Sequence, residues 1–191
     1  FEDAVDGKNV MTSQLRKKNY QMLASEDNIT VLDGIAHFTG NHTIDVQTPD
    51  GQTFTYKGER IFINTGAKAI IPDIPGLRES PFLMNSTTAM DQLKLPHDLV
   101  IIGGGYIGLE FANMFATFGS HVTILDHHKK LLPREDDDVA EMVIQNFRNN
   151  GINFEVGVNI KDISTQDEQA VITFTKDGQH ETTIFADKIL A

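Results

Sequence analysis

The sequence predicts an α/β fold in which an N-terminal helix and a first β-meander precede a parallel sheet and a second β-meander. Between residues 99 and 155, short apolar runs typical of buried strands alternate with two stretches of helical periodicity. Elsewhere, β-branched and aromatic runs are separated by turn sequences such as TGNH, PDG and KGE, as in antiparallel strands. Strands that alternate with helices form parallel sheets with right-handed crossovers.

The expected elements follow in chain order. Residues 1–24 are expected to form a helix, and β-strands are expected within 29–38, 43–48, 52–56 and 60–64. Residues 66–98 hold four of the six prolines and are expected to connect two domains. The later elements are strand 99–102, helix 106–118, strand 121–126, helix 139–149, strand 152–155, and shorter strands near 158–164, 170–175, 181–184 and 187–190.

Composition narrows the functional classes. The 191 residues are 40% hydrophobic, enough for one or two modest cores, and the net charge of −11 argues against binding to a nucleic-acid backbone. The absence of cysteine excludes a disulfide or a thiolate zinc site within this sequence. Without a signal sequence or an apolar run near 18 residues, we expect a soluble, cytoplasmic piece of a longer protein that does not bind membranes.

A short internal repeat relates the two halves of the chain. The tripeptide DGQ at 50–52 recurs at 177–179, and the same offset aligns IFINTG (61–66) with KILA (188–191). The repeat suggests two similarly built domains, each ending in a meander, an apolar strand and a Thr-Gly turn. On this basis a further glycine-rich turn is expected upstream of Phe1.

The segment GGGYIG at 103–108 fits G-x-G-x-x-G, and it stands between an expected strand and an expected helix. Gly103 would permit the tight turn, Gly105 would let the backbone approach a pyrophosphate, and Gly108 would allow close packing of the helix on the strand. The amides at the start of the helix would then face the phosphates. The pattern predicts a Rossmann-like dinucleotide-binding domain over residues 97–191.

The strand after this motif ends at Asp126, near the spacing of about 20 residues at which an acid meets the ribose of the dinucleotide. A carboxylate accepts hydrogen bonds from a free 2′,3′-diol but repels a 2′-phosphate, so NAD(H) is favoured over NADP(H). The basic cluster at 127–130 leaves the alternative open, because it could accommodate a phosphate.

The helix after the motif contains residues with two interpretations. Glu110 either complements the helix dipole or reaches toward the nicotinamide, and Tyr106 either packs or lies across the nicotinamide pocket. Gly119 is placed to end this helix. The apolar stripe expected to face the sheet consists of Ile107, Phe111, Met114, Phe115 and Phe118.

No metal site is predicted. Residues 135–138 are all acidic, but they precede an amphipathic helix, and DVAE at 138–141 fits a capping box. The seven histidines are dispersed apart from the pair at 127–128, and no cysteine accompanies them. The motifs of serine hydrolases and of P-loop enzymes do not occur.

Five segments together resemble the pyridine nucleotide–disulfide oxidoreductase family, and especially its mercuric-reductase-like branch, which contains the bacterial reactive-chlorine-resistance reductases. They are GIAHF (34–38), IFINTGAKAIIPDIPG (61–76), VIIGGGYIGLEFANMFATFGSHVTILD (100–126), LLPREDDDVA (131–140) and NNGINF (149–154). The resemblance implies a flavoprotein that transfers a hydride from NAD(P)H to FAD, from which electrons usually pass to a redox-active cysteine pair.

The resemblance also implies roles for individual residues. Those implied for the pyridine nucleotide are Gly103, Gly105, Ile107 and Gly108 at the pyrophosphate, Asp126 at the ribose, and Glu110 and Tyr106 near the nicotinamide. Those implied for FAD are Ala36 and His37 near the adenine, and Thr65 and Gly66 in a turn. The family has the sequence A-T-G in this turn, and this chain has N-T-G.

The family's FAD-binding glycine turn, its cysteine pair and its C-terminal catalytic and dimer-forming domain do not occur in this sequence. We therefore expect residues 1–96 to be a partial FAD-binding domain with its connection, and no catalytic residue in this chain. The full-length protein is expected to be a homodimer, and the isolated chain is expected to bind a pyridine nucleotide without holding FAD or turning over. The terminal electron acceptor stays open among a disulfide, a metal ion, a quinone and oxygen.

Two other functional classes are weighed against the reductase. One is a non-catalytic NAD-sensing regulatory module, in which the dinucleotide would regulate a partner. The other is a two-domain dehydrogenase without flavin, which has no need of a β-meander before its Rossmann unit. The sequence upstream of Phe1 would discriminate the first from the reductase.

Overall fold

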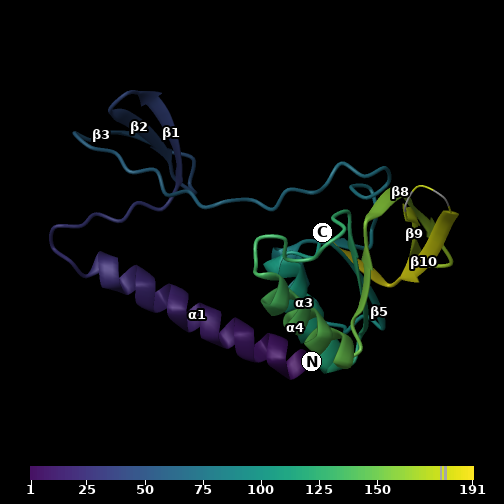
Figure 1. The fold of residues 1–191 in the computed structure, drawn as a ribbon. Helices are drawn as coiled ribbons and strands as arrows, with labels where there is room; N and C mark the ends of the chain where they lie inside the picture. The colour runs from purple at the N-terminus through teal and green to yellow at the C-terminus, as the bar shows by residue number, and fades with distance from the viewer. Residues whose placement is uncertain (177, 179) are drawn as a thin grey trace. The chain divides into compact units, whose positions relative to one another are not determined.

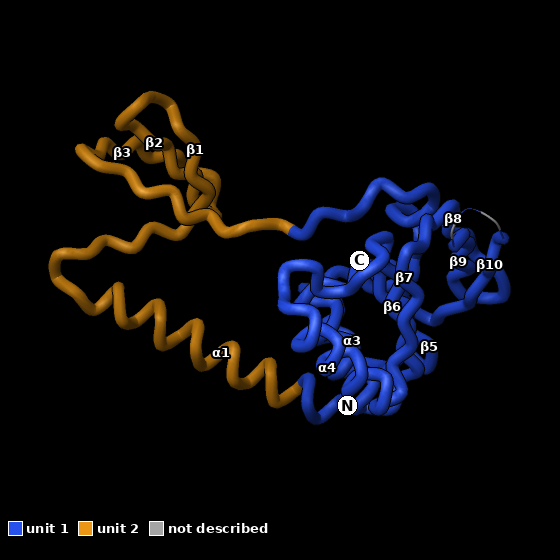
Figure 2. The backbone as a smooth tube through the Cα atoms, in the orientation of Figure 1, with its two compact units in different colours: residues 1–5, 69–191 blue, residues 6–68 orange. Residues whose placement is uncertain are grey.

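The computed structural model describes residues 1–191 except Asp177 and Gln179, and these residues form two compact units (Figure 2). The smaller unit comprises residues 6–68, and the larger one comprises residues 1–5 and 69–191. Among the described residues, no helix combines the length and the apolar character that crossing a membrane requires. The second copy of the DGQ repeat, at 177–179, lies partly outside the described residues.

The smaller unit contains most of one long helix and one antiparallel sheet (Figure 1). Helix α1 spans Glu2–Ala24, and strands β1 (Ile35–Gly40), β2 (Thr43–Gln47) and β3 (Thr53–Lys57) follow in the order β1-β2-β3. The helix and the meander agree with the sequence prediction, since turn residues separate each β-branched run from the next.

The strand expected at residues 60–64 is absent from the structure. This segment is in no strand, and Phe62 and Ile63 are 90% and 72% exposed. A strand needs a neighbouring strand to accept and donate its backbone hydrogen bonds. No described residue pairs with this segment, so its apolar pattern alone does not produce a strand.

The larger unit is built on a five-stranded parallel sheet with the order β4-β11-β5-β6-β7. Its strands are β4 (Leu83–Met84), β11 (Lys188–Leu190), β5 (Asp98–Ile102), β6 (His121–Asp126) and β7 (Asn153–Val156). Helices α2 (Ser86–Ala89), α3 (Tyr106–Phe118) and α4 (Asp137–Asn149) lie wholly within this unit. The bounds of α3 and β6 are those that the sequence predicts.

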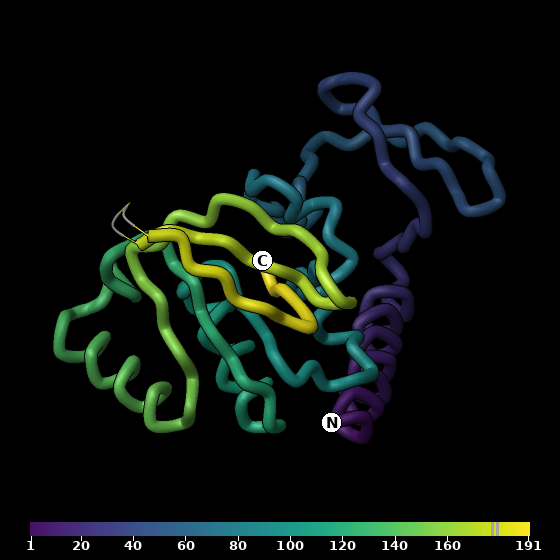
Figure 3. Tube along the Cα trace, turned by 90° about the vertical axis from the view of Figure 1, so that its right-hand side faces the viewer, coloured from purple at the N-terminus to yellow at the C-terminus, as the bar shows by residue number. Residues whose placement is uncertain are grey.

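The parallel sheet is covered on both faces (Figures 1 and 3). Leu99 and Ile101 of β5 pack in one core with α3 and α4, whereas Val100 packs in a second core with the antiparallel meander. The meander has the order β10-β9-β8, with β8 (Val158–Gln166), β9 (Gln169–Lys176) and β10 (His180–Ala186). Alternate residues of a strand point to opposite faces, so a strand covered on both faces reads as a continuous apolar run.

The buried side of α3 agrees in part with the predicted stripe: Phe115 is buried as predicted, and Phe111 and Met114 are partly buried against the same core. Its buried residues are Leu109, Ala112 and Phe115, while Ile107 and Phe118 are 61% and 40% exposed. Leu109 and Ala112, which the predicted stripe omits, share this core with Phe115, so the buried side of the helix is rotated from the predicted one. As predicted, Gly119 ends the helix with a left-handed backbone (φ 108°).

The start of α4 also differs from the prediction. The helix begins at Asp137, with Asp136 as its N-cap, and neither the predicted capping box nor any other side-chain cap is formed. With three consecutive aspartates available, the helix extends by two residues and places Asp137 and Asp138 in its first turn, where the helix dipole favours negative charge. Asp137 accepts a hydrogen bond from the Lys130 ammonium group.

The proline-rich segment packs more tightly than a plain connection would. Leu77 and Met84 are 0% and 2% exposed, and the Ile163 amide donates to the Pro75 carbonyl at 2.9 Å. Residues 69–96 therefore belong to the larger compact unit, whereas the expected domain boundary lies between residues 96 and 97. The buried apolar side chains of this segment provide the physical reason.

Candidate nucleotide-binding site

The glycine turn lies at the carboxyl end of β5, where it leads directly into α3. Gly103 has a φ of 104°, and its amide donates to the Leu125 carbonyl of the neighbouring strand at 2.9 Å. A Cβ at Gly108 would lie 2.2 Å from the Gly103 carbonyl oxygen. Only glycine at position 108 lets the first turn of α3 approach the strand this closely.

Two cavities meet at Gly105 and Tyr106, both within the larger unit. The first, of about 430 Å³, is formed by the ends of β5 and β11, the glycine turn and residues 69–70. The second, of about 250 Å³, lies between the glycine turn, Asp126, His128 and residues 132–134. The turn therefore separates two hollows, as a site for the two halves of a dinucleotide requires.

The first cavity also lies where the strand order reverses. From β5 the chain proceeds to β6 on one side through α3, and it returns much later to β11 on the other side. In open α/β sheets, ligands bind outside the carboxyl ends of the strands at such a switch point. The position of the first cavity follows this rule.

Asp126 ends β6 and is 7% exposed. Its carboxylate accepts hydrogen bonds from the Gly104 amide at 2.6 Å, the His128 amide at 2.7 Å and the His128 ring at 2.8 Å. Burial is the largest influence and opposes ionisation, but these hydrogen bonds together outweigh it, so the pKa of Asp126 lies below its ordinary value. The carboxylate is charged and ties the glycine turn to the end of β6.

Tyr106 lines both cavities and is 58% exposed. Its hydroxyl donates a hydrogen bond to the Glu135 carboxylate, and this bond raises the pKa of Tyr106. The contact holds the ring at the junction of the two hollows. The sequence did not predict Glu135 as the hydrogen-bond partner of Tyr106. An acidic residue just before a helix is already accounted for by its favourable interaction with the helix dipole.

The other residues implied for the pyridine nucleotide lie on the first turns of α3. Ile107 and Gly108 line the first cavity together with Gly103 and Gly105. Glu110 is exposed on α3, and it is not among the residues that line either of the two cavities. The structure thus brings the glycine turn, Tyr106, Ile107 and Asp126 together around the two cavities. Glu110 lies outside the lining of both.

The residues implied for FAD belong to the smaller unit. Ala36 and His37 are exposed on β1, and Thr65 and Gly66 are exposed in the extended segment after β3. Gly66 has a φ of 74°, as a turn residue would.

Two clusters of potential metal ligands were missed by sequence reasoning. His97, Asp98 and His121 lie together, and so do Asp126, His127 and His128. His97 and His121 are far apart in sequence, and only the register of β5 against β6 brings them side by side. The sequence signal for this pair was weak: His121 begins a predicted strand, and His97 lies two residues before another.

The parallel sheet, the glycine turn and the cavities at the switch point define a Rossmann-like α/β unit. The family model described as pyridine nucleotide-disulphide oxidoreductase matches residues 2–191. The chain therefore belongs to this family.

Several relatives are similar to this chain. The probable pyridine nucleotide-disulfide oxidoreductase RclA of Escherichia coli is 42% identical over 172 residues, which are 90% of this chain and 39% of the relative. A mercuric reductase of Streptomyces lividans is 34% identical over 182 residues, or 95% of this chain and 38% of the relative. A solved structure of the HOCl-induced flavoprotein disulfide reductase RclA from Escherichia coli matches with a TM-score of 0.90 and 38% identity, covering 100% of this chain and 42% of that one.

These matches cover only part of each relative. The chain spans about two fifths of the length of RclA and of the Streptomyces mercuric reductase. The predicted fold class and the predicted family resemblance are both confirmed.

Proposed function

We propose that residues 97–191 bind the pyridine nucleotide of an FAD-dependent oxidoreductase, and that residues 1–96 contribute part of its FAD-binding domain with the connection. When bound, NADH supplies a hydride for the flavin. The role of this chain is to hold the dinucleotide at the carboxyl ends of β5, β6 and β11. The observation that carries the proposal is the pair of cavities on the two sides of Gly105 and Tyr106.

The residues of the turn suit a pyrophosphate. A Cβ at Gly105 would meet no atom within 4 Å, so the backbone is open to a ligand there. Gly105 is also the N-cap of α3, and no side chain caps this helix. The first amides of α3 thus have no side-chain acceptor, and helix N-termini of this kind bind phosphate groups.

We further propose that the nucleotide is NADH rather than NADPH. Asp126 lines the second cavity and is charged, so it would repel a 2′-phosphate. An ionised carboxylate offers about four acceptor sites, and three hydrogen bonds within the protein leave room for a ribose hydroxyl. The ring of His128 is directed at Asp126 and so is engaged within the protein.

A titration of the chain with NADH tests the site. We expect Gly105→Val to weaken NADH binding at least about tenfold, or 1.4 kcal/mol, because the new side chain fills the space open to the pyrophosphate. The fold should be retained, since Gly105 has an extended backbone (φ −75°) and a Cβ there meets open space. NADH fluorescence measures the affinity, and circular dichroism verifies the fold.

The control for this titration is Gly7→Val, because a Cβ at Gly7 on α1 also meets open space. This variant should bind NADH as the unaltered chain does. Equal affinity of the Gly105→Val chain, or no saturable binding by the unaltered chain, would contradict the proposal.

FAD binding is proposed for the full-length protein only. The four residues implied for FAD are exposed in the smaller unit, and the glycine turn that the family uses for FAD does not occur in this sequence. After incubation with FAD and gel filtration, we expect no flavin absorbance to elute with the chain. Assembly of the full-length protein as a cytoplasmic homodimer is likewise proposed from the family resemblance.

A further inference from the structure

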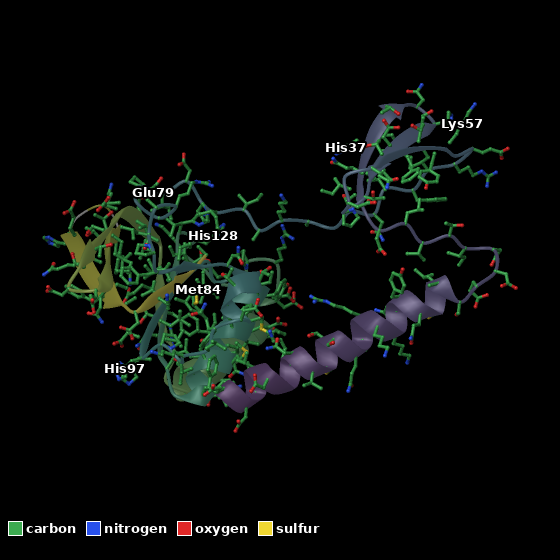
Figure 4. All side chains as sticks on the ribbon, turned by 180° about the vertical axis from the view of Figure 1, so that it is seen from behind. His37, Lys57, Glu79, Met84, His97 and His128 are labelled. Carbon is green, nitrogen blue, oxygen red and sulfur yellow. The ribbon has the colours of Figure 1, made fainter. Side chains whose placement is uncertain are left out.

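Two histidines and an aspartate meet at the end of the parallel sheet opposite the glycine turn. Asp98 begins β5 directly after His97, and His121 begins β6. The glycine turn follows the other end of β5, and a strand of this length extends over about 16 Å. Figure 4 shows His97 and His128 apart from each other, with Met84 labelled between them. The cluster is therefore separate from the nucleotide site.

We propose that His97, Asp98 and His121 form a site for a divalent transition-metal ion of the Zn²⁺ class. The His97 Nδ1 lies 2.8 Å from Asp98 Oδ2, and the His121 Nδ1 lies 3.4 Å from Asp98 Oδ1. One ligand atom from each residue lies within 4.8 Å of the others. Tetrahedral Zn²⁺ with bonds of about 2.0–2.1 Å holds its ligand atoms about 3.4 Å apart. The observed separations lie on both sides of this spacing.

The donor set selects the class of ion. Two imidazole nitrogens and one carboxylate oxygen suit Zn²⁺ and its neighbours, whereas Mg²⁺ and Ca²⁺ prefer sets made of oxygen alone. The side chains of His97, Asp98 and His121 are 69%, 40% and 70% exposed, which leaves room for water to complete the coordination. The chain's net charge of −11 also favours cations near its surface.

The backbone that carries the three ligands is already fixed. Asp187 Oδ2 accepts hydrogen bonds from the His97 amide at 2.9 Å and the Asp98 amide at 3.0 Å, and Gln169 donates to the other oxygen of Asp187. The His121 amide donates to the His97 carbonyl at 2.7 Å. Metal binding would therefore order only side-chain torsions, which lowers its entropic cost. Asp187 is a positioning residue for this site.

The cluster at Asp126 is the competing location, since it also brings together a carboxylate and two histidines. The Asp126 carboxylate, however, already accepts three hydrogen bonds and lines the nucleotide cavity. A metal ion there would replace the hydrogen bond from the His128 ring and would compete with the nucleotide for the carboxylate. At the His97 cluster the hydrogen bond that would give way joins the His97 ring to Asp98, away from the nucleotide cavity.

Isothermal titration of the EDTA-treated chain with ZnCl₂ tests the proposal. We expect one saturable site, which His121→Ala and Asp98→Asn each weaken at least about tenfold, because each removes one of three ligands. His180→Ala removes an exposed histidine of β10 and should leave the affinity unchanged. The double variant His127→Ala/His128→Ala should also leave it unchanged. Absence of a saturable site, or a loss that follows the double variant, would overturn the proposal.

A second readout needs no ligand variant. In NMR spectra of the histidine rings, Zn²⁺ should shift the signals of His97 and His121, whereas shifts confined to His127 and His128 would refute the assignment. Saturation with NADH should leave the Zn²⁺ affinity unchanged, because the two sites lie at opposite ends of β5. A chain that fails to bind NADH would therefore still give the same Zn²⁺ result.

Discussion

Replacing Gly76 by alanine is expected to destabilise the larger unit by at least about 3 kcal/mol. Gly76 has a φ of 76°, and a Cβ there would lie 1.8 Å from the Ile163 carbonyl oxygen and 2.9 Å from its carbonyl carbon. Both obstacles are backbone atoms of β8, so no side-chain rotation removes the overlap. The segment at 75–76 would have to leave the meander and break the hydrogen bond from the Ile163 amide to Pro75.

The matched control is Gly151→Ala. Gly151 also has a left-handed backbone (φ 81°) in the same unit, but a Cβ there would meet no atom within 4 Å. This control therefore measures the backbone conformational cost alone, about 1–2 kcal/mol. Urea unfolding followed by circular dichroism compares the two variants. Equal losses in both would show that the close approach to Ile163 contributes nothing.

The IPDIPG segment illustrates what the sequence does not reveal. Its prolines indicate a connection, but the burial of Leu77 and the approach of Gly76 to β8 depend on a strand that lies far along the chain. Propensity and periodicity describe local preferences, and they carry no information about which distant backbone a glycine must admit. The absence of a strand at 60–64 has the same cause, since a strand depends on its partner.

The region from β5 to β6 was predicted almost without error because its signals are local. The glycine motif begins α3 and Gly119 ends it. One apolar strand, β5, precedes the motif, and another, β6, follows the helix. The face of α3 was predicted only in part, because the spacing of the large apolar residues marked Phe115 correctly but did not indicate that Leu109 and Ala112 are buried. Which side chain faces the sheet depends on how closely the helix approaches, and that distance is a tertiary property.

The site was predictable to a similar extent. The motif and the spacing to Asp126 located the glycine turn and the carboxylate, but they did not reveal that Asp126 already binds the turn within the protein. The pairing of Tyr106 with Glu135 and that of His97 with His121 also arise only from the tertiary arrangement. Asp126 thus has a structural contact in addition to its proposed role at the ribose, and one substitution tests both.

Asp126→Asn is expected to lower the free energy of unfolding by about 2–3 kcal/mol. The two carboxylate oxygens accept hydrogen bonds from the amides of Gly104 and His128. Asparagine has one oxygen and one NH₂ group, so one of the two amides would face another hydrogen-bond donor and lose its acceptor. Asp137→Asn is the control, because Asp137 is exposed and its ion pair with Lys130 lies on the surface. Similar unfolding curves for the two variants would contradict the structural role of Asp126.

The difference in unfolding free energy between the original chain and Asp126→Asn is expected to depend on pH in a defined direction. The pKa of Asp126 in the folded chain lies below its ordinary value of 3.8, so the unfolded chain takes up the proton first as the pH falls. The stabilisation by Asp126 is therefore complete above that ordinary value and is lost as the pH falls through the lower folded value. The unfolding free energies of the original chain and the Asp126→Asn variant should converge over this acidic range.

The same variant tests the nucleotide preference by a separate measurement. Removing the negative charge removes the repulsion of a 2′-phosphate, so the ratio of NADPH to NADH affinity should rise, while the loss of a ribose acceptor should weaken NADH binding. An unchanged ratio would show that His127, His128 and the neighbouring lysines determine the preference instead. Because the unfolding measurement contains no nucleotide, its result stands even if neither nucleotide binds. The two measurements thus separate the hydrogen bonds of Asp126 to amides of the chain from its proposed contact with the ribose.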